Sequence, residues 1–317
     1  MAKQSTKNEL QEGCGFSADD VFEQGPEKPL DESHFVIHAP QGVGKTFLGL
    51  SADPVFPVDL YAKKKTVLER IIHVAFDKGA LDGITQYGLS VKYRIDARKI
   101  LRSPRKGQKQ PHAEAGAMQA LDWITDAVAE YIDRYDIQAV IFDTMTNAST
   151  EIMKHAENLD FRSEKTGKPD KFAMWAFVGH ALATLWEWGA NQPCQMFWLC
   201  HSKAVGDENL IAGTHMKPGS EQARLEQLKA RANKGLGDWE IVPALDGKKG
   251  IEVFTSHASL IATMTADFNE ETKKYERFVL PRGGRGFLGK NRWFDVLDER
   301  EPANMQKIFA KIRKACA

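Results

Sequence analysis

From Phe35 onward, short apolar runs alternate with longer amphipathic segments, and this alternation predicts the architecture. Four apolar runs predict buried strands, over residues 35–38, 89–95, 139–142 and 195–199. Apolar residues at helical spacing predict helices over residues 45–51, 66–76, 113–135, 172–188 and 303–314. Strands that are apolar throughout and separated by helices are typical of a parallel sheet covered by helices on both faces.

Other segments are less regular. Residues 55–60 predict a strand, which Pro57 makes irregular or places at an edge of the sheet. In the last third of the chain, residues 220–233 predict a charged helix, and strands over 258–268 and 275–280 flank a polar turn, as in a β-hairpin. The sequence thus predicts an α/β fold with a mostly parallel sheet sandwiched by helices, followed by a C-terminal β-hairpin extension and a helix.

The charge of the chain is balanced overall but unevenly distributed. The 43 Lys and Arg residues equal the 43 Asp and Glu residues, so the net charge predicts no nucleic-acid partner. Residues 1–33 are acidic and rich in polar residues, Gly and Pro, which predicts a flexible arm before one domain over residues 34–317. Residues 92–109 carry eight basic residues against Asp96 alone. These two segments indicate surfaces that meet polyanions or each other.

The cysteines and the most apolar segment bear on the compartment. The chain has four cysteines without a CxxC pair or metal-ligand spacing: Cys14, Cys194, Cys200 and Cys316. They predict reduced thiols in a cytosolic protein. The N-terminus has no apolar signal region, and the run over residues 172–190 is too short and too interrupted by His180 and Glu187 to span a bilayer. We therefore expect a soluble, cytoplasmic protein without a membrane partner.

The segment after the first predicted strand carries the most specific chemical signal. Phosphate binding requires converging backbone N–H groups, a helix N-terminus and one cation. Gly42 and Gly44 allow the tight loop, Lys45 supplies the cation, and Thr46 offers a hydroxyl to Mg²⁺. The pattern is [AG]xxxxGK[ST], and it predicts an ATP and Mg²⁺ site formed by Ala39, Pro40, Gln41, Gly42, Val43, Gly44, Lys45, Thr46 and Phe47.

Two further polar residues follow predicted buried strands. Asp143 ends the apolar strand over 139–142, where a carboxylate can hold Mg²⁺ through water. His201 follows the strand over 195–199, where a polar side chain can sense the γ-phosphate or the attacking water. We predict that Thr46 and Asp143 form the metal site, and that His201 couples the nucleotide to the loop after it.

These signals, in this order, resemble the RecA-like class of P-loop ATPases. More closely, the chain looks like the short core-only RecA family encoded by many phages, which comprises AAA-type ATP-binding proteins and single-strand-annealing recombinases. The matching segments run from Ile37 to Thr46, from Ala139 to Asp143, from Cys200 to Lys203 and from Gly289 to Arg292. The resemblance implies that Lys290 and Arg292 act as fingers that reach the γ-phosphate of a neighbouring subunit in a ring or filament.

The chain departs from the family at the catalytic acid. The family commonly has Asp-Thr-Glu at the end of the strand after the P-loop helix, whereas this chain has Val58-Asp59-Leu60 in the corresponding predicted strand. Asp59 is the expected water-positioning acid, and Glu69 is the alternative. This departure predicts ATP binding with hydrolysis that is slow or stimulated by DNA.

The resemblance also implies two loops that contact single-stranded DNA. The first covers residues 160–171, with Arg162, Lys165, Lys168 and Lys171. The second begins at Ser202 and includes Lys203, Lys217, Arg224, Lys229, Arg231 and Lys234. Phosphate contacts by such side chains give sequence-independent, salt-sensitive binding. Acidic residues are interleaved with the basic ones, so solvated loops are the alternative.

The sequence leads to one functional hypothesis and two alternatives. We predict an ATP-hydrolysing RecA-like protein that acts on single-stranded DNA in phage recombination, annealing or replication. The first alternative is a helicase-type motor, for which the chain has no obvious additional domain. The second is a nucleotide-gated scaffold or regulatory ATPase that does not bind DNA, which the missing Asp-Thr-Glu favours.

Overall fold

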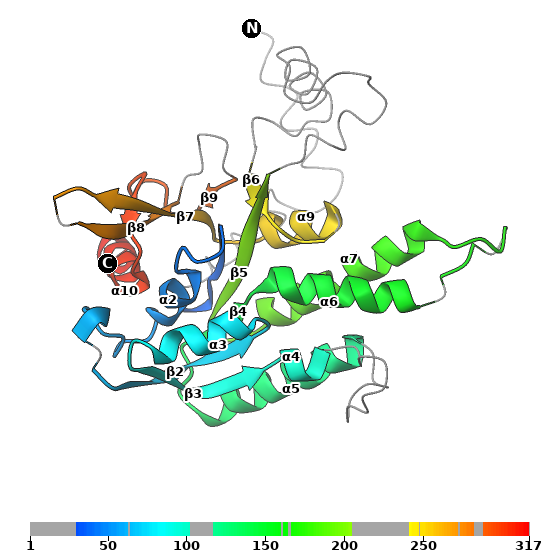
Figure 1. Cartoon of the computed structure of the whole chain (residues 1–317), viewed down its shortest axis with the longest axis horizontal. Helices are drawn as coiled ribbons and strands as arrows, with labels where there is room; N and C mark the ends of the chain where they lie inside the picture. Colours follow the sequence, from blue (N-terminus) through cyan, green and yellow to red (C-terminus); the bar gives the residue numbers. More distant parts are fainter. Residues whose placement is uncertain are drawn as a thin grey trace, which may run out of the picture.

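The computed structural model describes residues 30–62, 64–101, 117–159, 161–163, 166–204, 241–246, 248–271, 273–281 and 288–316 (Figure 1). Within these residues, ten strands form one sheet in the order β10-β8-β7-β1-β5-β4-β2-β3, with β6 paired to β5 and β9 paired to β7. Two short 3-10 helices, η1 (Leu30–Glu32) and η2 (Leu60–Ala62), lie outside the sheet.

Neighbouring strands in the middle of the sheet are all parallel. In spatial order they are β7 (Leu260–Asn269), β1 (His34–Ala39), β5 (Gln195–Ala204), β4 (Ala139–Asp143), β2 (Thr66–Ala75) and β3 (Leu89–Asp96). The antiparallel strands are β6 (Ile241–Pro243), β8 (Lys274–Leu280), β9 (Lys290–Asn291) and β10 (Glu301–Pro302). Because the central strands are parallel, their carboxyl ends meet at one edge, where open α/β sheets bind ligands.

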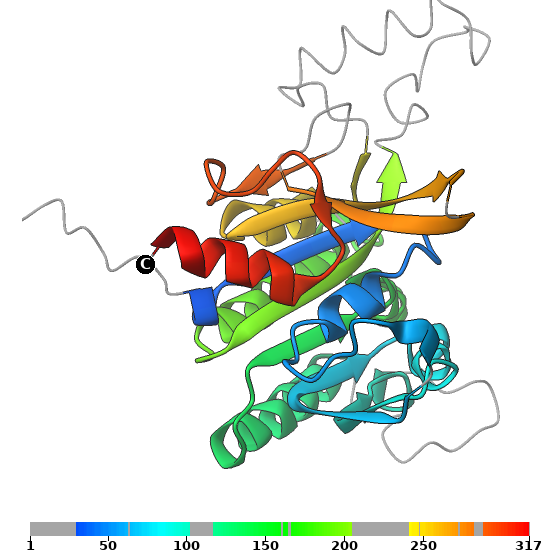
Figure 2. The same ribbon diagram turned by 90° about the vertical axis from the view of Figure 1, so that its left-hand side faces the viewer.

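Helices cover both faces of the sheet. One hydrophobic cluster joins the sheet to α5 (Ala117–Arg134), α6 (Met145–Asn158), α7 (Lys171–Ala190) and α9 (Lys248–Ser256), with α4 (Arg98–Leu101) beside it. The other joins it to α2 (Lys45–Leu50), α3 (Lys78–Thr85) and α10 (Met305–Cys316). Figure 2 shows α10 lying across its face of the sheet. Successive residues of β1 alternate between the clusters, since Phe35 and Ile37 belong to the second and Val36 to the first.

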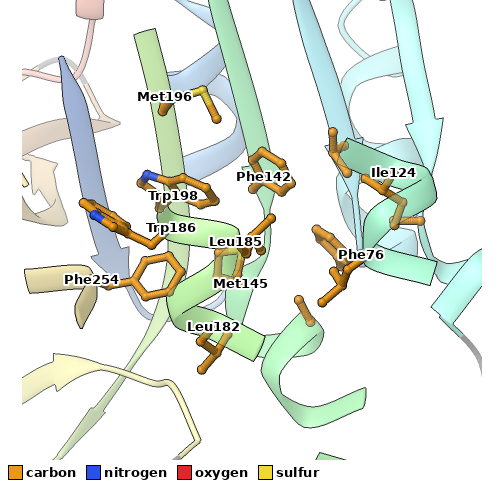
Figure 3. Packing of buried hydrophobic residues seen from close by; sticks show 14 of the residues in the cluster. Phe76, Ile124, Phe142, Met145, Leu182, Leu185, Trp186, Met196, Trp198 and Phe254 are labelled. Atoms are coloured by element: carbon orange, nitrogen blue, oxygen red, sulfur yellow. The ribbon is translucent and has the colours of Figure 1, made fainter. Parts of the chain in front are cut away.

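Large aromatic side chains fix β4 and β5 against the helices of the first cluster. Trp198 of β5 stacks on Phe142 of β4 with ring centroids 4.8 Å apart, and it meets Phe254 of α9 edge-on at 5.2 Å (Figure 3). Trp186 of α7 packs against the same Trp198 ring at 5.4 Å. Phe142 directly precedes Asp143 in the chain. This packing therefore positions the end of β4 relative to β5.

The fold class predicted from the sequence is confirmed. The strands predicted over residues 35–38, 89–95, 139–142 and 195–199 correspond to β1, β3, β4 and β5. The predicted hairpin is the antiparallel pair of β7 and β8, and the predicted last helix is α10. The fold is thus a mostly parallel α/β sheet with helices on both faces, in which β5 separates β1, the strand before the predicted phosphate loop, from β4.

Two predicted elements are wrong. Residues 66–76, predicted as a helix, form the strand β2, and residues 55–60, predicted as a strand, form turns and bends before η2. In β2 the pairing register with β3 shifts between Leu68 and Ile72. Residues 71–75 are all buried, and together with Leu68 they do not alternate as the residues of a half-buried strand do. Among them Leu68, Ile71, Ile72 and Ala75 fall at the spacing of one helix face, which is why the sequence suggested a helix.

Some helices and strands were not predicted from the sequence, and some predicted segments lie outside the described residues. The helices α3, α4, α6 and α9 and the short strands β6, β9 and β10 had no counterpart in the sequence analysis. The helix predicted over residues 220–233 lies outside the described residues, as does most of the predicted N-terminal arm. None of the helices in the described part of the chain combines the length and the apolar composition that a membrane span needs.

Candidate nucleotide-binding site

Four neighbouring strand ends bring the predicted site residues together. Ala39 of β1 lies opposite His201 of β5, and Asp143 of β4 lies opposite Ala75 of β2. A cavity of about 220 Å³ opens at this edge of the sheet. Its walls include Gly42, Lys45, Thr46, Asp77, Asp143 and His201. The sheet thus places the predicted phosphate loop, the predicted metal ligand and the predicted sensor around one space.

Two glycines give the phosphate loop its shape. Gly42 and Gly44 have φ angles of 82° and 111°, in the left-handed region that strains other residues. A Cβ atom on Gly44 would also meet Nε of Arg277, on β8, at 3.0 Å. The same Nε donates a hydrogen bond to the carbonyl oxygen of Val43 at 2.8 Å. The C-terminal hairpin therefore supports the loop from outside.

Lys45 is buried inside the loop. Its Nζ donates hydrogen bonds to the carbonyl oxygens of Ala39 at 3.0 Å and Pro40 at 2.9 Å, and lies 3.4 Å from Nδ1 of His201. Burial lowers the pKa of Lys45, an effect that the nearby carboxylate of Asp143 opposes. A phosphate in the cavity offers this ammonium group a charged acceptor in place of neutral carbonyls, which makes a stronger hydrogen bond.

Thr46 and Asp143 form a compact oxygen pair. Oγ1 of Thr46 donates to Oδ2 of Asp143 at 2.6 Å, and Nε2 of His73 lies 3.3 Å from the same oxygen. Both Asp143 and His73 are buried. A hydroxyl and a carboxylate at the edge of a phosphate cavity suit Mg²⁺, which prefers oxygen ligands and keeps several of its waters. The sequence analysis missed His73, for which the signal was a single polar residue between Ile72 and Val74.

Asp77, which the sequence analysis missed, occupies the place expected for Asp59. Asp59 precedes η2, where its Oδ1 accepts a hydrogen bond from the backbone N–H of Tyr61 at 2.9 Å, and it does not line the cavity. Asp77 follows β2 by two residues and lines the cavity. Burial lowers the pKa of Lys45, and the carboxylate of Asp77, like that of Asp143, opposes this shift in part. Asp59 was expected there because residues 55–60 were predicted as the strand after the phosphate-loop helix, whereas that strand is β2, which was predicted as a helix.

His201 lies at the cavity, whereas the two predicted fingers do not. Burial lowers the pKa of His201, and its backbone N–H donates to Oγ1 of Thr146 at 2.8 Å. Lys290 is exposed on β9 and pairs with Ile261 near the start of β7, away from the carboxyl edge. Arg292 is also exposed, and neither basic residue lines the cavity of its own chain.

A second cavity adjoins the first at Gly44 and Phe47. Its volume is about 200 Å³, and four aromatic rings line it together with aliphatic side chains. Phe47 and Tyr87 meet edge-on with centroids 5.0 Å apart, and Tyr61 meets Tyr87 at 6.2 Å. Arg277 lines the same cavity. Phe47, predicted as the last residue of the nucleotide site, therefore borders both cavities.

Only parts of the predicted DNA loops are described. In the first, Arg162, Lys168 and Lys171 are exposed beside the start of α7, whereas Lys165 lies outside the described residues. In the second, Nζ of Lys203 donates to the carbonyl oxygen of Leu245 at 2.6 Å. The other basic residues predicted for the second loop lie outside the described residues: Lys217, Arg224, Lys229, Arg231 and Lys234.

Three of the four basic residues described within the segment over residues 92–109 make ion pairs. Lys92 pairs with Glu69 at 3.2 Å, and the guanidinium of Arg98 pairs with Asp96 at 2.8 Å. Lys99 lies 3.7 Å from the same Asp96 carboxylate. Two carboxylates, those of Glu69 and Asp96, therefore lie beside the described basic side chains of this segment.

Comparisons with known proteins place the chain among distant structural neighbours. No family model matches the sequence, and no curated protein does. Solved structures similar to the chain include a KaiC-like protein from the hyperthermophilic archaeon Pyrococcus horikoshii. Its TM-score is 0.36 and its sequence identity 10%, with 80% of each chain covered. This similarity is too low to assign a function to the chain.

Proposed function

We propose that the chain binds MgATP at the carboxyl edge of its sheet and hydrolyses it. The observation that carries this proposal is the convergence of Lys45, Thr46, Asp77, Asp143 and His201 on one cavity. A phosphate loop with two left-handed glycines, a buried lysine and a hydroxyl–carboxylate pair matches the requirements for binding a nucleotide phosphate with its metal.

Each residue has a distinct role in this proposal. Lys45 binds the β- and γ-phosphates, while Thr46 and Asp143 hold Mg²⁺, which neutralises charge on the phosphates when it is bound. His73 orients the Asp143 carboxylate. Asp77 orients and polarises the attacking water, and His201 contacts the γ-phosphate side of the cavity. The aromatic cavity that begins at Phe47 accepts the base of the nucleotide.

The fingers complete a shared site in this proposal. Lys290 and Arg292 are exposed and do not line the cavity of their own chain. In a ring or filament they reach the γ-phosphate bound by a neighbouring subunit, where a cation stabilises the charge of the transition state. Self-association is therefore part of the proposed mechanism.

Calorimetric titration of the full chain with ATP, with and without Mg²⁺, tests the binding step. Lys45→Ala is expected to weaken binding about 10- to 100-fold, because a hydrogen bond to a charged group contributes about 1.5–3 kcal/mol. Lys92→Ala is the matched control, because Lys92 lies on β3 and pairs with Glu69 outside the cavity. Equal weakening by both substitutions, or no binding by the wild-type chain, contradicts the proposal.

We further propose that single-stranded DNA binds beside the α6–α7 connection. Phe172 and Trp175, at the start of α7, are 86% and 44% exposed, and they lie near Lys168 and Lys171. Figure 1 shows that α6 and α7 run side by side away from the body of the molecule. Exposed rings next to basic side chains suit a single strand, which offers bases for stacking and phosphates for charge.

Binding of a fluorescent oligothymidine, followed by anisotropy, tests this second proposal. Phe172→Ala and Trp175→Ala are each expected to lower the affinity at least fivefold, because stacking on one base contributes about 1–3 kcal/mol. Phe268→Ala and Tyr275→Ala are matched controls, because these rings are 45% and 61% exposed on the β7–β8 hairpin. Equal effects of all four changes, or no binding by the wild type, favour a nucleotide-gated scaffold instead.

A further inference from the structure

His38 lies one residue before the end of β1 and is fully buried where several segments meet. Its Nδ1 lies 3.0 Å from Oγ of Ser202, on β5. Its Nε2 lies 3.0 Å from the carbonyl oxygen of Leu288 and 3.0 Å from Oγ1 of Thr263, on β7. One side chain thus connects the strand that leads into the phosphate loop with three segments distant in sequence.

The contact with Leu288 fixes the directions of these hydrogen bonds. A carbonyl oxygen can only accept, so Nε2 carries the hydrogen and Nδ1 accepts from the hydroxyl of Ser202. Burial lowers the pKa of His38 to about 4, although the bond to Leu288 opposes this shift. The neutral ring with this one tautomer therefore persists at physiological pH.

The residues that His38 contacts are neighbours in the chain of the two parts of the proposed mechanism, the nucleotide cavity and the finger segment. Ser202 directly follows His201, which lines the nucleotide cavity. Leu288 lies two residues before the finger segment, residues 290–292. The backbone N–H of Leu288 also donates to the carbonyl oxygen of Ile241, on β6, at 2.9 Å. The His38 ring is thus a direct buried link between the strand of the phosphate loop and the approach to the finger segment.

We propose that His38 is a positioning residue that holds the finger segment in a fixed place relative to the phosphate loop of its own subunit. This inference rests on the proposed function, in which the finger segment completes the site of a neighbour. His38 does not line the nucleotide cavity, so it acts through the Leu288 carbonyl group and not on the nucleotide. The placement of a finger in the neighbouring site then depends on the sheet of the subunit that donates it.

Mixed assemblies of two full-length variants test the inference, at an ATP concentration at which each variant alone hydrolyses little ATP. The acceptor is Arg292→Ala, which keeps a complete nucleotide cavity but lacks a finger. The donor is Lys45→Ala, which keeps the finger but has a disabled cavity. Only acceptor cavities completed by donor fingers hydrolyse ATP in the mixture, so any effect of a change at His38 in the donor acts through the finger.

Two substitutions in the donor separate positioning from general damage. His38→Gln places an amide nitrogen near the position of Nε2 and keeps a donor for the Leu288 carbonyl, whereas His38→Leu removes it. We expect the Lys45→Ala donor and its His38→Gln derivative to restore hydrolysis to similar rates. The His38→Leu derivative is expected to restore at least tenfold less, at donor concentrations where thermal melting shows that both derivatives are folded.

The outcomes distinguish this inference from the proposed function. Equal restoration by the His38→Leu and His38→Gln donors overturns the positioning role while leaving the shared site intact. Equal loss with both derivatives also overturns it, because the retained donor group then has no effect. If the donor with intact His38 restores no hydrolysis, the fingers do not act between subunits, and the shared site falls together with this inference.

Discussion

Asp77 and Asp59 differ in the element that precedes each of them. Asp77 follows the buried strand β2 and therefore reaches the carboxyl edge of the sheet, where it lines the nucleotide cavity. Asp59 lies in a turn, and its carboxylate accepts a hydrogen bond from the N–H of Tyr61. An aspartate thus borders the candidate nucleotide cavity in one place and makes a local structural contact in the other.

The pKa of His38 makes a prediction about stability at the scale of one residue. The pKa is about 4 in the folded chain against an ordinary 6.5, so the unfolded chain binds this proton first as the pH falls. The contribution of His38 to the free energy of unfolding is fully present above pH 6.5 and is lost as the pH falls toward 4. Between pH 7 and pH 5, the free energy of unfolding is expected to fall by about 2 kcal/mol from this group alone.

Urea unfolding at pH 7 and pH 5 measures this contribution. Other groups titrate in the same range, so the wild type is compared with His38→Gln, which has no ionisable group at this position. The decrease in the free energy of unfolding from pH 7 to pH 5 is expected to be about 2 kcal/mol smaller in His38→Gln than in the wild type. An equal loss in both proteins contradicts the assignment.

At the scale of elements, the sequence predicts correctly those helices and strands whose apolar residues follow one regular spacing. The strands β1, β4 and β5 were predicted from short apolar runs. The helices α5 and α7 were predicted from long segments, and both are present. The apolar residues of β2 include a set at helical spacing, although residues 71–75 are all buried, so the strand was predicted as a helix. That error, together with the wrong strand over residues 55–60, led to Asp59 in place of Asp77. The position of Asp77 could not be predicted, because it depends on pairing with β3 and β4.

Helix α7 packs so closely on β5 that one glycine is required there. A Cβ atom on Gly189 would lie 2.6 Å from Cζ2 of Trp198, whose ring is fully buried. Gly189→Ala is expected to lower the free energy of unfolding by about 1–3 kcal/mol, as overpacking does. Gly83→Ala in α3 is the control, because no atom lies within 4 Å of its Cβ position.

Thermal or urea unfolding without nucleotide compares the two glycine variants. Alanine is favoured over glycine inside a helix by about 1 kcal/mol, so Gly83→Ala is expected to keep or raise the stability. A Gly189→Ala variant as stable as the wild type would show that Trp198 can move, against the close packing described for α7 and β5.

At the scale of the whole molecule, the candidate site depends on segments far apart in the chain. The phosphate loop begins at Ala39, Asp77 follows β2, Asp143 ends β4, and His201 lies in β5. The parallel order of these strands places all four at one edge. Motif reading located the loop, Asp143 and His201, whereas the fingers and the DNA contacts remain predictions that involve a second subunit or a second molecule.

Steady-state ATP hydrolysis by full-length wild type, Asp77→Asn and Asp59→Asn tests the central claim most directly, with ATP affinity measured on the same samples. We predict that Asp77→Asn lowers kcat about 100-fold or more, the usual contribution of a positioned base, while ATP affinity stays within a few fold. Asp59→Asn is predicted to turn over at the wild-type rate. Loss of turnover in Asp59→Asn, or wild-type turnover in Asp77→Asn, would contradict the assignment of the catalytic edge.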